Sequence, residues 1–460
     1  MNGAASELSP NRRRWLLAAV MSGLLLAMLD QSIVGTALPT IVQTLGGNDL
    51  YVWVATAYLV TATVSLPIYA RLSDRHGRRA LLLIGMALFL LGSGLAATAQ
   101  NMEQLIGYRG LQGLGAGALE GLSFILVADL FAGRRSAALQ GALAGLMGVA
   151  FIAGPLVGGF LTDHVGWRSV FTVNLPIGAV ALAVVATVLP ASVGRSERRS
   201  TPLDLTGIAL LTLGVGLLLI GLNERHLVLI AGGLVVIAGF LAVERRAVAP
   251  IIPLKLFADR KVAAIMIAGA TSTFGLFAGA LLLPRYFQQV RDVSATHSGL
   301  LIYPLLLGIL VSVNVAGMLI ARRLEFRGTV LAGAGLAALG ALGFATFDAS
   351  TPDWQSLIFM GLMGLGIGPA LSGLQIALQR SVLPQQIGGA MGTLLLLRQV
   401  GGAVALASAE TVYRAGSDPA VSTGTGVLTI GLVGSLIAAL ALISLPRGAG
   451  RLPAPAMAPA

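Results

Sequence analysis

The sequence predicts an all-α integral membrane protein with fourteen transmembrane helices. Of the 460 residues, 56% are hydrophobic and only 11% are charged, and the mean hydropathy is +0.87. Soluble globular domains carry roughly 25% charged residues, so a soluble fold has no way to bury this much apolar surface. The apolar residues also form runs of about 20, the length at which an α-helix crosses the bilayer core.

The runs are arranged as six, two and six along the chain. The first six lie near 15–38, 51–70, 80–99, 103–130, 136–162 and 167–190. The central pair lies near 204–222 and 226–243. The last six lie near 261–283, 298–320, 329–347, 354–378, 387–411 and 424–444.

These runs divide the chain into seven parts. We expect a cytoplasmic N-terminus (1–14), a first six-helix half (15–190), a cytoplasmic linker (191–203), a central two-helix insertion (204–243), a second linker (244–260), a second six-helix half (261–444) and a disordered cytoplasmic tail (445–460).

The distribution of positive charge predicts the orientation. Most of the 30 lysine and arginine residues fall in connections that lie on one side of the membrane, including 12–14, 71–79, 195–199 and 245–261. Positively charged connections remain on the cytoplasmic side of a membrane. We therefore expect a protein of the cell inner (plasma) membrane with both termini in the cytoplasm. The net charge of +11 has the same origin, and we expect no nucleic-acid partner.

The sequence offers no constellation for enzyme chemistry. There is no cysteine, and none of the four histidines pairs with another at metal-ligand spacing. A phosphate-cradling GxxxxGK[ST] loop is also absent from the sequence, which argues against direct coupling to ATP. We therefore expect no catalytic residue, metal or cofactor, and a transport process driven by a gradient.

The stretch "YARLSDRHGRRALLL" (69–83) joins the second and third runs. Composition alone fits a solvated loop equally well. Its spacing resembles the signature loop of the major facilitator superfamily, with Ala70 in place of the leading glycine. That resemblance implies a cytoplasmic gate loop formed by Asp74, Arg75, Gly77, Arg78 and Arg79.

Further motifs follow in order along the chain. "LIGYRGLQGLGAG" (105–117) resembles the fourth-helix motif of the superfamily, and "GLMGVAFIAGPLVGG" (145–159) resembles the fifth-helix motif of proton-driven exporters. "LDQSIVGTALPT" (29–40), "WRSVFTVNLPIG" (167–178) and "RQVGG" (398–402) are similar to the fourteen-helix drug:proton antiporters. The resemblance covers about residues 15–445.

The resemblance implies a major facilitator fold, in which two six-helix halves flank the central pair. It also implies proton-coupled export of amphiphilic, often cationic, drugs or dyes by alternating access. A dedicated exporter of one endogenous metabolite, antibiotic or lipid would use the same helices, and a channel or non-transporting receptor is a remote alternative. The expected partners are the small substrate, protons and the lipid bilayer, and we expect a monomer.

Two residues of the fifth helix form a candidate hinge. Pro155 removes a backbone hydrogen bond, and Gly154 lets another helix approach closely. Ordinary helix packing explains both residues as well. The resemblance implies that this helix governs the rocking of the two halves.

Ionisable residues in the membrane usually mark ion or substrate pathways. Asp30 lies about 22 Å from the inner end of its helix, and Arg109 about 9 Å from the outer end of its own, so their depths agree. Glu120 follows Arg109 on the same helix face and is predicted to line a cavity. We assign proton coupling to Asp30, Arg109 and Glu120; the alternatives are a static ion pair and a buried structural acid.

The remaining candidates surround these acids or lie in the second half. Candidate walls of the substrate cavity are Gln31, Trp53, Tyr58 and Gln112, although Trp53 also fits an interfacial aromatic belt. In the second half, Arg398 is assigned to packing or gating. Two further residues are expected near the outer surface: Glu410 at the membrane interface, and Arg285 where it modulates entry or simply snorkels.

Overall fold

The computed structural model describes residues 9–130, 133–190, 204–247, 250–383, 386–446 and 448–452. Within these ranges the regular structure is helical, apart from one isolated bridge between Glu325 and Arg451. The predicted first linker (191–203) lies outside the described residues, as do the ends of the two predicted cytoplasmic termini (1–8 and 453–460).

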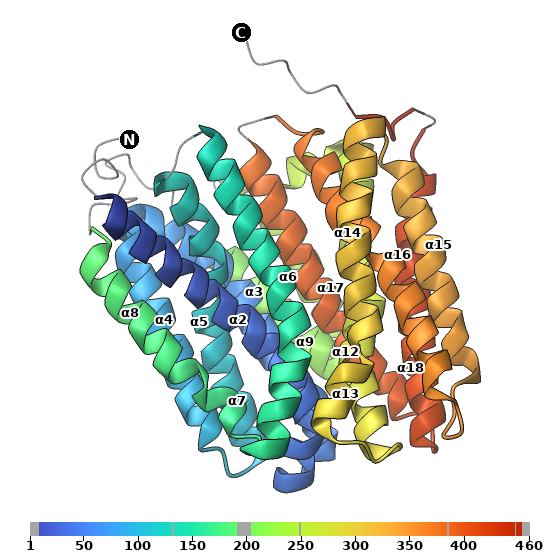
Figure 1. The fold of residues 1–460 in the computed structure, drawn as a ribbon. Helices are drawn as coiled ribbons and strands as arrows, with labels where there is room; N and C mark the ends of the chain where they lie inside the picture. The colour runs from blue at the N-terminus through green and yellow to red at the C-terminus, as the bar shows by residue number, and fades with distance from the viewer. Residues whose placement is uncertain are drawn as a thin grey trace. The chain divides into compact units, whose positions relative to one another are not determined.

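Each predicted run corresponds to one helix or to two consecutive helices (Figure 1). The helices of the first half and the central pair are α2 (Pro10–Leu45), α3 (Tyr51–His76), α4 (Arg78–Ala97), α5 (Met102–Leu130), α6 (Gly133–His164), α7 (Ser169–Thr172), α8 (Asn174–Val188), α9 (Leu205–Asn223) and α10 (Leu227–Glu244). Those that follow are α11 (Arg260–Thr271), α12 (Phe274–Gln289), α13 (Ala295–Leu301), α14 (Tyr303–Arg323), α15 (Arg327–Gly343), α16 (Asp353–Gln379), α17 (Ile387–Tyr413) and α18 (Pro419–Ile443). Short 3₁₀ turns occur at η1 (Asn48–Leu50), η2 (Leu254–Ala258) and η3 (Phe344–Thr346).

The helices confirm the predicted fold class. Among the described residues, 13 helical segments are long and apolar enough to cross a membrane. The helix α6 occupies the place of the remaining predicted span and is 32 residues long. The protein is therefore a multi-pass, all-helical membrane protein.

Three spans that the sequence predicts as single helices are broken in the structure. Breaks separate α7 from α8, α11 from α12, and α13 from α14. In two of these cases a proline, Pro176 or Pro304, lies in the first turn of the following helix, where its missing N–H leaves the preceding turn without a hydrogen bond. The break between Thr271 and Phe274 contains no proline.

The chain forms two compact units. The first unit contains residues 1–213, 247–249 and 292–300, and the second contains 214–246, 250–291 and 301–460. The boundary falls inside α9, whereas the sequence-based division gave the central pair a part of its own.

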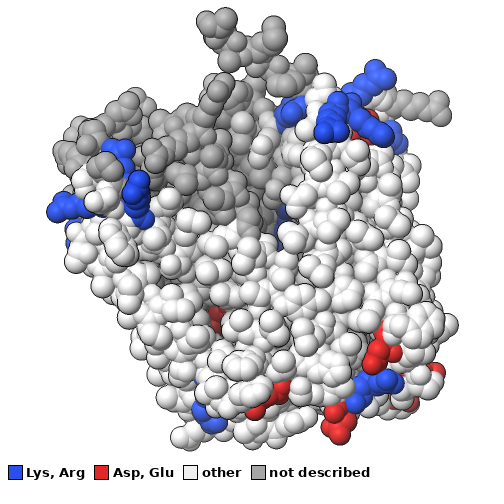
Figure 2. All heavy atoms as spheres, in the orientation of Figure 1, with Lys and Arg blue, Asp and Glu red and all other residues white. Residues whose placement is uncertain are grey.

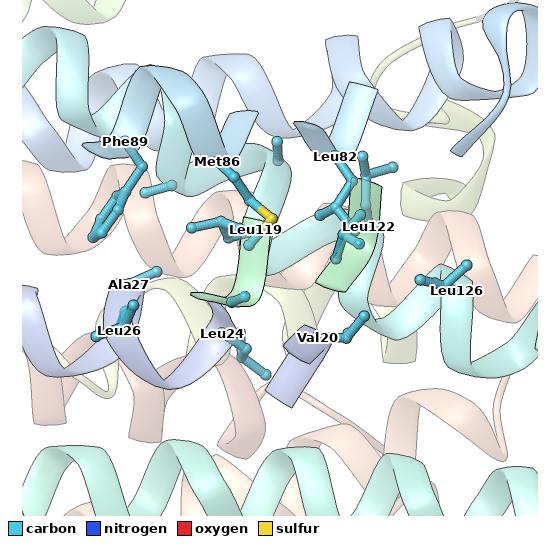
Figure 3. Close-up of a cluster of buried hydrophobic side chains, with 14 of the residues drawn as sticks. Val20, Leu24, Leu26, Ala27, Leu82, Met86, Phe89, Leu119, Leu122 and Leu126 are labelled. Atoms are coloured by element: carbon cyan, nitrogen blue, oxygen red, sulfur yellow. The ribbon is translucent and has the colours of Figure 1, made fainter. Parts of the chain in front are cut away.

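The first unit is built on α5. Helices α3 and α4 pack against it, while α2 packs against α6 and α8. Close approach depends on glycines of α5: a side chain at Gly115 would meet the backbone of Phe89 and Gly85, and one at Gly113 would meet the carbonyl of Tyr58. An apolar core lies between α2, α4 and α5, as Figure 3 shows with Leu24, Met86, Leu119 and their neighbours.

A short segment from the second half of the sequence also belongs to the first unit. The Asp163 carboxylate, at the end of α6, accepts hydrogen bonds from the backbone N–H groups of Ala295 (3.0 Å) and Thr296 (2.7 Å) and from the Thr296 hydroxyl (2.5 Å). The first turn of α13 is thereby attached to α6.

The second unit has two packed groups of helices. The helix α16 lies against α14 and α15, while α11 and α12 pack against α17 and α18. Here too glycines permit contact, since a side chain at Gly364 of α16 would meet the carbonyl of Leu305 in α14. The turn between α9 and α10 is attached to α17, because Arg225 donates to the Thr411 carbonyl (2.7 Å) and the Thr411 hydroxyl donates to the Leu222 carbonyl (2.6 Å).

Charged side chains are concentrated at the ends of the helices. On the face seen in Figure 2, most of the coloured lysine, arginine, aspartate and glutamate side chains lie near the two ends of the helices, and the surface between them is largely uncharged. This pattern suits a surface whose middle contacts lipid hydrocarbon.

The contacts of α5 predict a contrast between two of its glycines. Gly115→Ala should destabilise the protein by about 1–3 kcal/mol, because the methyl group would overlap the backbone of α4. The matched control is Gly107→Ala on the exposed side of the same helix, where no atom lies within 4 Å of an added Cβ. Thermal unfolding of the purified variants in detergent measures the difference. Equal midpoints would contradict the assigned packing.

Candidate functional site

An ion pair joins two helices in the middle of the first unit. Asp30 of α2 is 0% exposed and Arg109 of α5 is 1% exposed, and the guanidinium binds Oδ2 of the carboxylate. The sequence-based expectation that these residues lie at the same depth is therefore confirmed. Both charges depend on each other, because removal of either one would leave an uncompensated ion in an apolar interior.

Two amide side chains complete the surroundings of the Asp30 carboxylate. Gln112 Nε2 donates to Oδ1 at 2.8 Å, and Asn174 Nδ2 donates to the same oxygen at 2.9 Å. An ionised carboxylate is an acceptor at both oxygens. Three donors from α5 and α8 thus surround the Asp30 carboxylate.

Arg109 is held by further groups of α3 and α5. Its Nε donates to the Val54 carbonyl (3.3 Å), and one terminal nitrogen donates to Gln112 Oε1 (2.6 Å). The guanidinium carbon also lies 4.2 Å from the centre of the Tyr58 ring, within the range of a cation–π interaction. The Tyr58 hydroxyl donates to the Ala27 carbonyl of α2 at 2.9 Å.

Ser93 of α4 binds both amide side chains, those of Gln112 and Asn174. Its hydroxyl oxygen accepts from Gln112 Nε2 (3.2 Å) and Asn174 Nδ2 (2.9 Å), and the hydroxyl donates to the Phe171 carbonyl (2.9 Å). The sequence analysis missed both Ser93 and Asn174. Asn174 did carry a signal, a polar residue inside an apolar run and inside a family-like motif, whereas Ser93 in "LFLLGSGLAA" carried none.

The predicted cavity residues fall into two groups. Tyr58 and Gln112 are fully buried in the network around Asp30, while Gln31 and Trp53 are half-buried. Contact between a substrate and Tyr58 or Gln112 therefore requires this network to open. Glu120, eleven residues beyond Arg109 on α5, is also buried.

The predicted gate loop is a sharp turn between α3 and α4. Gly77 adopts φ +89°, a conformation that side chains disfavour, and thereby separates the two helices. Arg78 donates to the Ser73 hydroxyl, and Arg79 donates to the Ala186 carbonyl of α8. Asp74 and Arg75 belong to the last turns of α3, and their side chains lie outside the described part of the structure.

The candidate hinge lies in close contact with α2. The helix α6 continues through Pro155, whose missing N–H cannot bond the carbonyl of Phe151. The Ser32 hydroxyl of α2 donates to this carbonyl at 3.3 Å and replaces the lost bond. Gly154 makes the approach possible, since a side chain there would meet the Ser32 hydroxyl. The hinge residues thus contact α2 at Ser32, two residues after Asp30.

The second unit contains an ionic cluster that differs from the expectation. Glu410 is 0% exposed and Arg285 is 2% exposed, and one Arg285 nitrogen lies 3.1 Å from Glu410 Oε2. Arg414 Nε lies 2.9 Å from Glu410 Oε1, and the Arg285 guanidinium carbon is 4.0 Å from the centre of the Tyr413 ring. Snorkelling of Arg285 was a wrong expectation, because its guanidinium is buried against Glu410. Glu410 lies near the end of α17, and its carboxylate is buried inside the protein.

The other predicted residue of the second unit, Arg398, lies near the middle of α17. It donates to the carbonyls of Ala370 and Leu371 in α16. Across the described ranges of the chain, no group of three histidine, cysteine, aspartate or glutamate side chains is placed to hold a metal ion.

Because Glu410 is buried and Asp353 is exposed, we expect neutralisation of these two acids to lower the free energy of unfolding by different amounts. Glu410→Gln should lower the free energy of unfolding by about 3 kcal/mol, because Arg285 would keep its charge without a carboxylate partner. The control is Asp353→Asn in the more exposed pair with Arg291, where we expect a loss below about 1 kcal/mol. Unfolding of both variants in mixed detergent measures the two values, and similar losses would argue against a buried cluster.

Comparison with known proteins places this arrangement in a family. The family model described as Major Facilitator Superfamily matches residues 20–406. Over 423 residues the chain is 32% identical to the multidrug transporter protein MdtP of Bacillus subtilis (strain 168), covering 90% of this chain and 77% of the relative. It is 30% identical over 398 residues to multidrug resistance protein 3 of the same organism, covering 84% of this chain and 77% of that protein.

A solved structure has the same fold. The crystal structure of a D-xylose–proton symporter superposes with a TM-score of 0.68 at 15% identity, covering 95% of this chain and 99% of that one. The family match extends over most of the chain, and the residues of the buried ion pair both lie inside it. The chain belongs to the major facilitator superfamily of membrane transporters.

Proposed function

We propose that this protein is a proton-coupled secondary active exporter of amphiphilic, often cationic, drugs or dyes. The observation that carries the proposal is the buried Asp30–Arg109 pair, with its three donors to one carboxylate. The names of the two Bacillus subtilis relatives support the export of several compounds.

Protonation of Asp30 would change the packing of several helices. The ionised carboxylate binds α2 to donors from α5 and α8, and a neutral carboxyl would lose most of its attraction for Arg109. Because Asp30 is fully buried, a proton reaches it only after α2 and α5 separate near this point. Proton binding and the opening of the first unit are thus linked in this proposal, as alternating access requires.

Glu120 is the second acid assigned to this process. It is buried in the inner half of α5, on the helix that carries Arg109 and Gln112. A carboxylate at membrane depth attracts cations, which suits either a cationic substrate or a proton. We propose no cofactor and no catalytic chemistry, because a proton gradient supplies the driving force.

The remaining features of the proposal follow from the chain's charges and family. Arginine-rich connections support an inner (plasma) membrane location with both termini in the cytoplasm. We propose that the protein works as a monomer. A dedicated exporter of one endogenous metabolite, antibiotic or lipid remains the second candidate, and susceptibility of cells to a panel of drugs and dyes distinguishes the two. Transport that ignores an imposed pH gradient would instead favour a channel.

Asp30→Asn should abolish proton-coupled efflux. Asparagine cannot titrate, and it leaves Arg109 without a charged partner, so we expect a stability loss of about 3 kcal/mol. It keeps an oxygen that accepts from Gln112 and Asn174, so we still expect a folded protein. Efflux from proteoliposomes with the pH gradient set in either direction measures the effect, and size-exclusion chromatography checks folding. Glu103→Gln, in the exposed first turn of α5, is the control. Normal gradient-driven efflux by Asp30→Asn would reduce the pair to a static structural contact.

Glu120→Gln should weaken the transport of cationic substrates more than that of neutral ones, because it removes a negative charge while preserving the shape of the side chain. Efflux rates of cationic and neutral dyes, measured in the same vesicles, provide the comparison. Equal losses would assign Glu120 to proton coupling, and unchanged rates would show that it is structural.

A further inference from the structure

Arg398 is a buried charge that the proposed proton pathway does not use. It lies on α17, about 17 Å from the start of the helix and about 22 Å from its end by the helical rise, and thus near the middle of the span. Only 8% of its side chain is exposed. Charged residues at this depth are costly and generally serve a function.

Among the residues that the structure describes, the hydrogen-bond partners of Arg398 are carbonyls alone. One terminal nitrogen of Arg398 donates to the carbonyls of Ala370 and Leu371 in α16, both at 3.2 Å. The Nε–H is buried and makes no hydrogen bond with any residue that the structure describes. It lies near Gly269 of α11, since a Cβ built on that glycine would be 3.9 Å from Nε.

Three other arginines are buried: Arg78, at the start of α4, donates to the Ser73 hydroxyl, and the remaining two lie deeper in their helices. Arg109 and Arg285 each bind a carboxylate that is 0% exposed. Arg398 takes part in none of the ion pairs found among the described residues. Neutral carbonyl partners can be bound by an uncharged amide as well, so they do not explain why this position carries a charge.

A second polar feature is the break between α11 and α12, which α17 contacts about one helical turn beyond Arg398. Gly401 faces the break between α11 and α12, where the Phe274 ring would be 3.4 Å from an added Cβ. The N-terminal residue before α12 is Thr273, which is 4% exposed and whose hydroxyl makes no hydrogen bond with the described residues. The start of the 16-residue α12 brings its first N–H groups to this break, where the last carbonyls of α11 also lie.

We propose that Arg398 and the start of α12 dock an anionic group, a carboxylate, of the transported molecule. Both features lie within the second unit, and each offers buried donors without an acceptor. Half-helix N-termini at membrane depth are suited to anionic substrate groups. The inference rests on the proposed export function and extends its substrates to amphiphilic acids and zwitterions.

The test compares rhodamine B, which carries a carboxylate at neutral pH, with its ethyl ester, which does not. Fluorescence anisotropy measures equilibrium binding of each dye to the purified protein without a pH gradient. The wild-type protein should prefer the acid by about tenfold or more, as a charge-assisted hydrogen bond implies. Arg398→Gln should remove this preference and leave ester binding within about twofold. Arg398→Lys should retain part of it because the charge remains.

Two further variants keep the result interpretable. Thr273→Val removes only a hydroxyl and should lower the acid preference several-fold, which tests the site even where Arg398→Gln does not fold. Arg291→Gln removes a positive charge from an exposed pair of the same unit and should change nothing.

Three outcomes of the dye comparison overturn the proposal. They are a wild-type protein without acid preference, an acid preference that survives in Arg398→Gln, and an equal loss for acid and ester. A preference that disappears on adding phosphatidylglycerol would assign Arg398 to a lipid phosphate instead and would also overturn it. Gradient-driven efflux of the ester is measured separately, so failure of the export function is distinguishable from failure of this site.

Discussion

Charges inside a membrane protein must be compensated by the protein itself, because neither lipid nor water is there to solvate them. The first unit meets this constraint at Asp30. Its carboxylate binds Arg109 and Gln112 of α5 and Asn174 of α8, while Ser93 of α4 holds the two amides. One acid thereby connects helices that are far apart in the sequence. A change in the charge of Asp30 would therefore alter the contacts of all these helices.

The second unit solves the same problem in two other ways. Glu410 is shared between two arginines near the C-terminal end of α17. Arg398, about 18 Å away along that helix, binds only carbonyls among the residues that the structure describes. The two units are therefore not electrostatic copies of each other, although the chain repeats its six-helix pattern. Under the proposed function, these unlike charges would provide separate places for a proton and for a charged group of the cargo.

Close approach of helices is the second constraint, and both units meet it with glycine. Gly154 brings α6 onto α2 at Ser32, and Gly401 brings α17 onto the break between α11 and α12. In the first unit this contact also repairs the hydrogen bond that Pro155 removes, through the Ser32 hydroxyl. The hinge motif is thus a packing contact as well.

The sequence by itself determined the membrane class, the order of the spans and the common depth of Asp30 and Arg109. These follow from hydrophobic run length and helical rise, which are local properties. It also singled out Gly77, where the chain needs a left-handed turn. Only the tertiary structure decided that Asn174 and Ser93 reach Asp30, that Glu410 is buried against Arg285, and that Arg398 has no carboxylate among the described residues. Those outcomes depend on the rotation of each helix and on its neighbours, and a run of apolar residues with little periodic contrast carries almost no information about rotation.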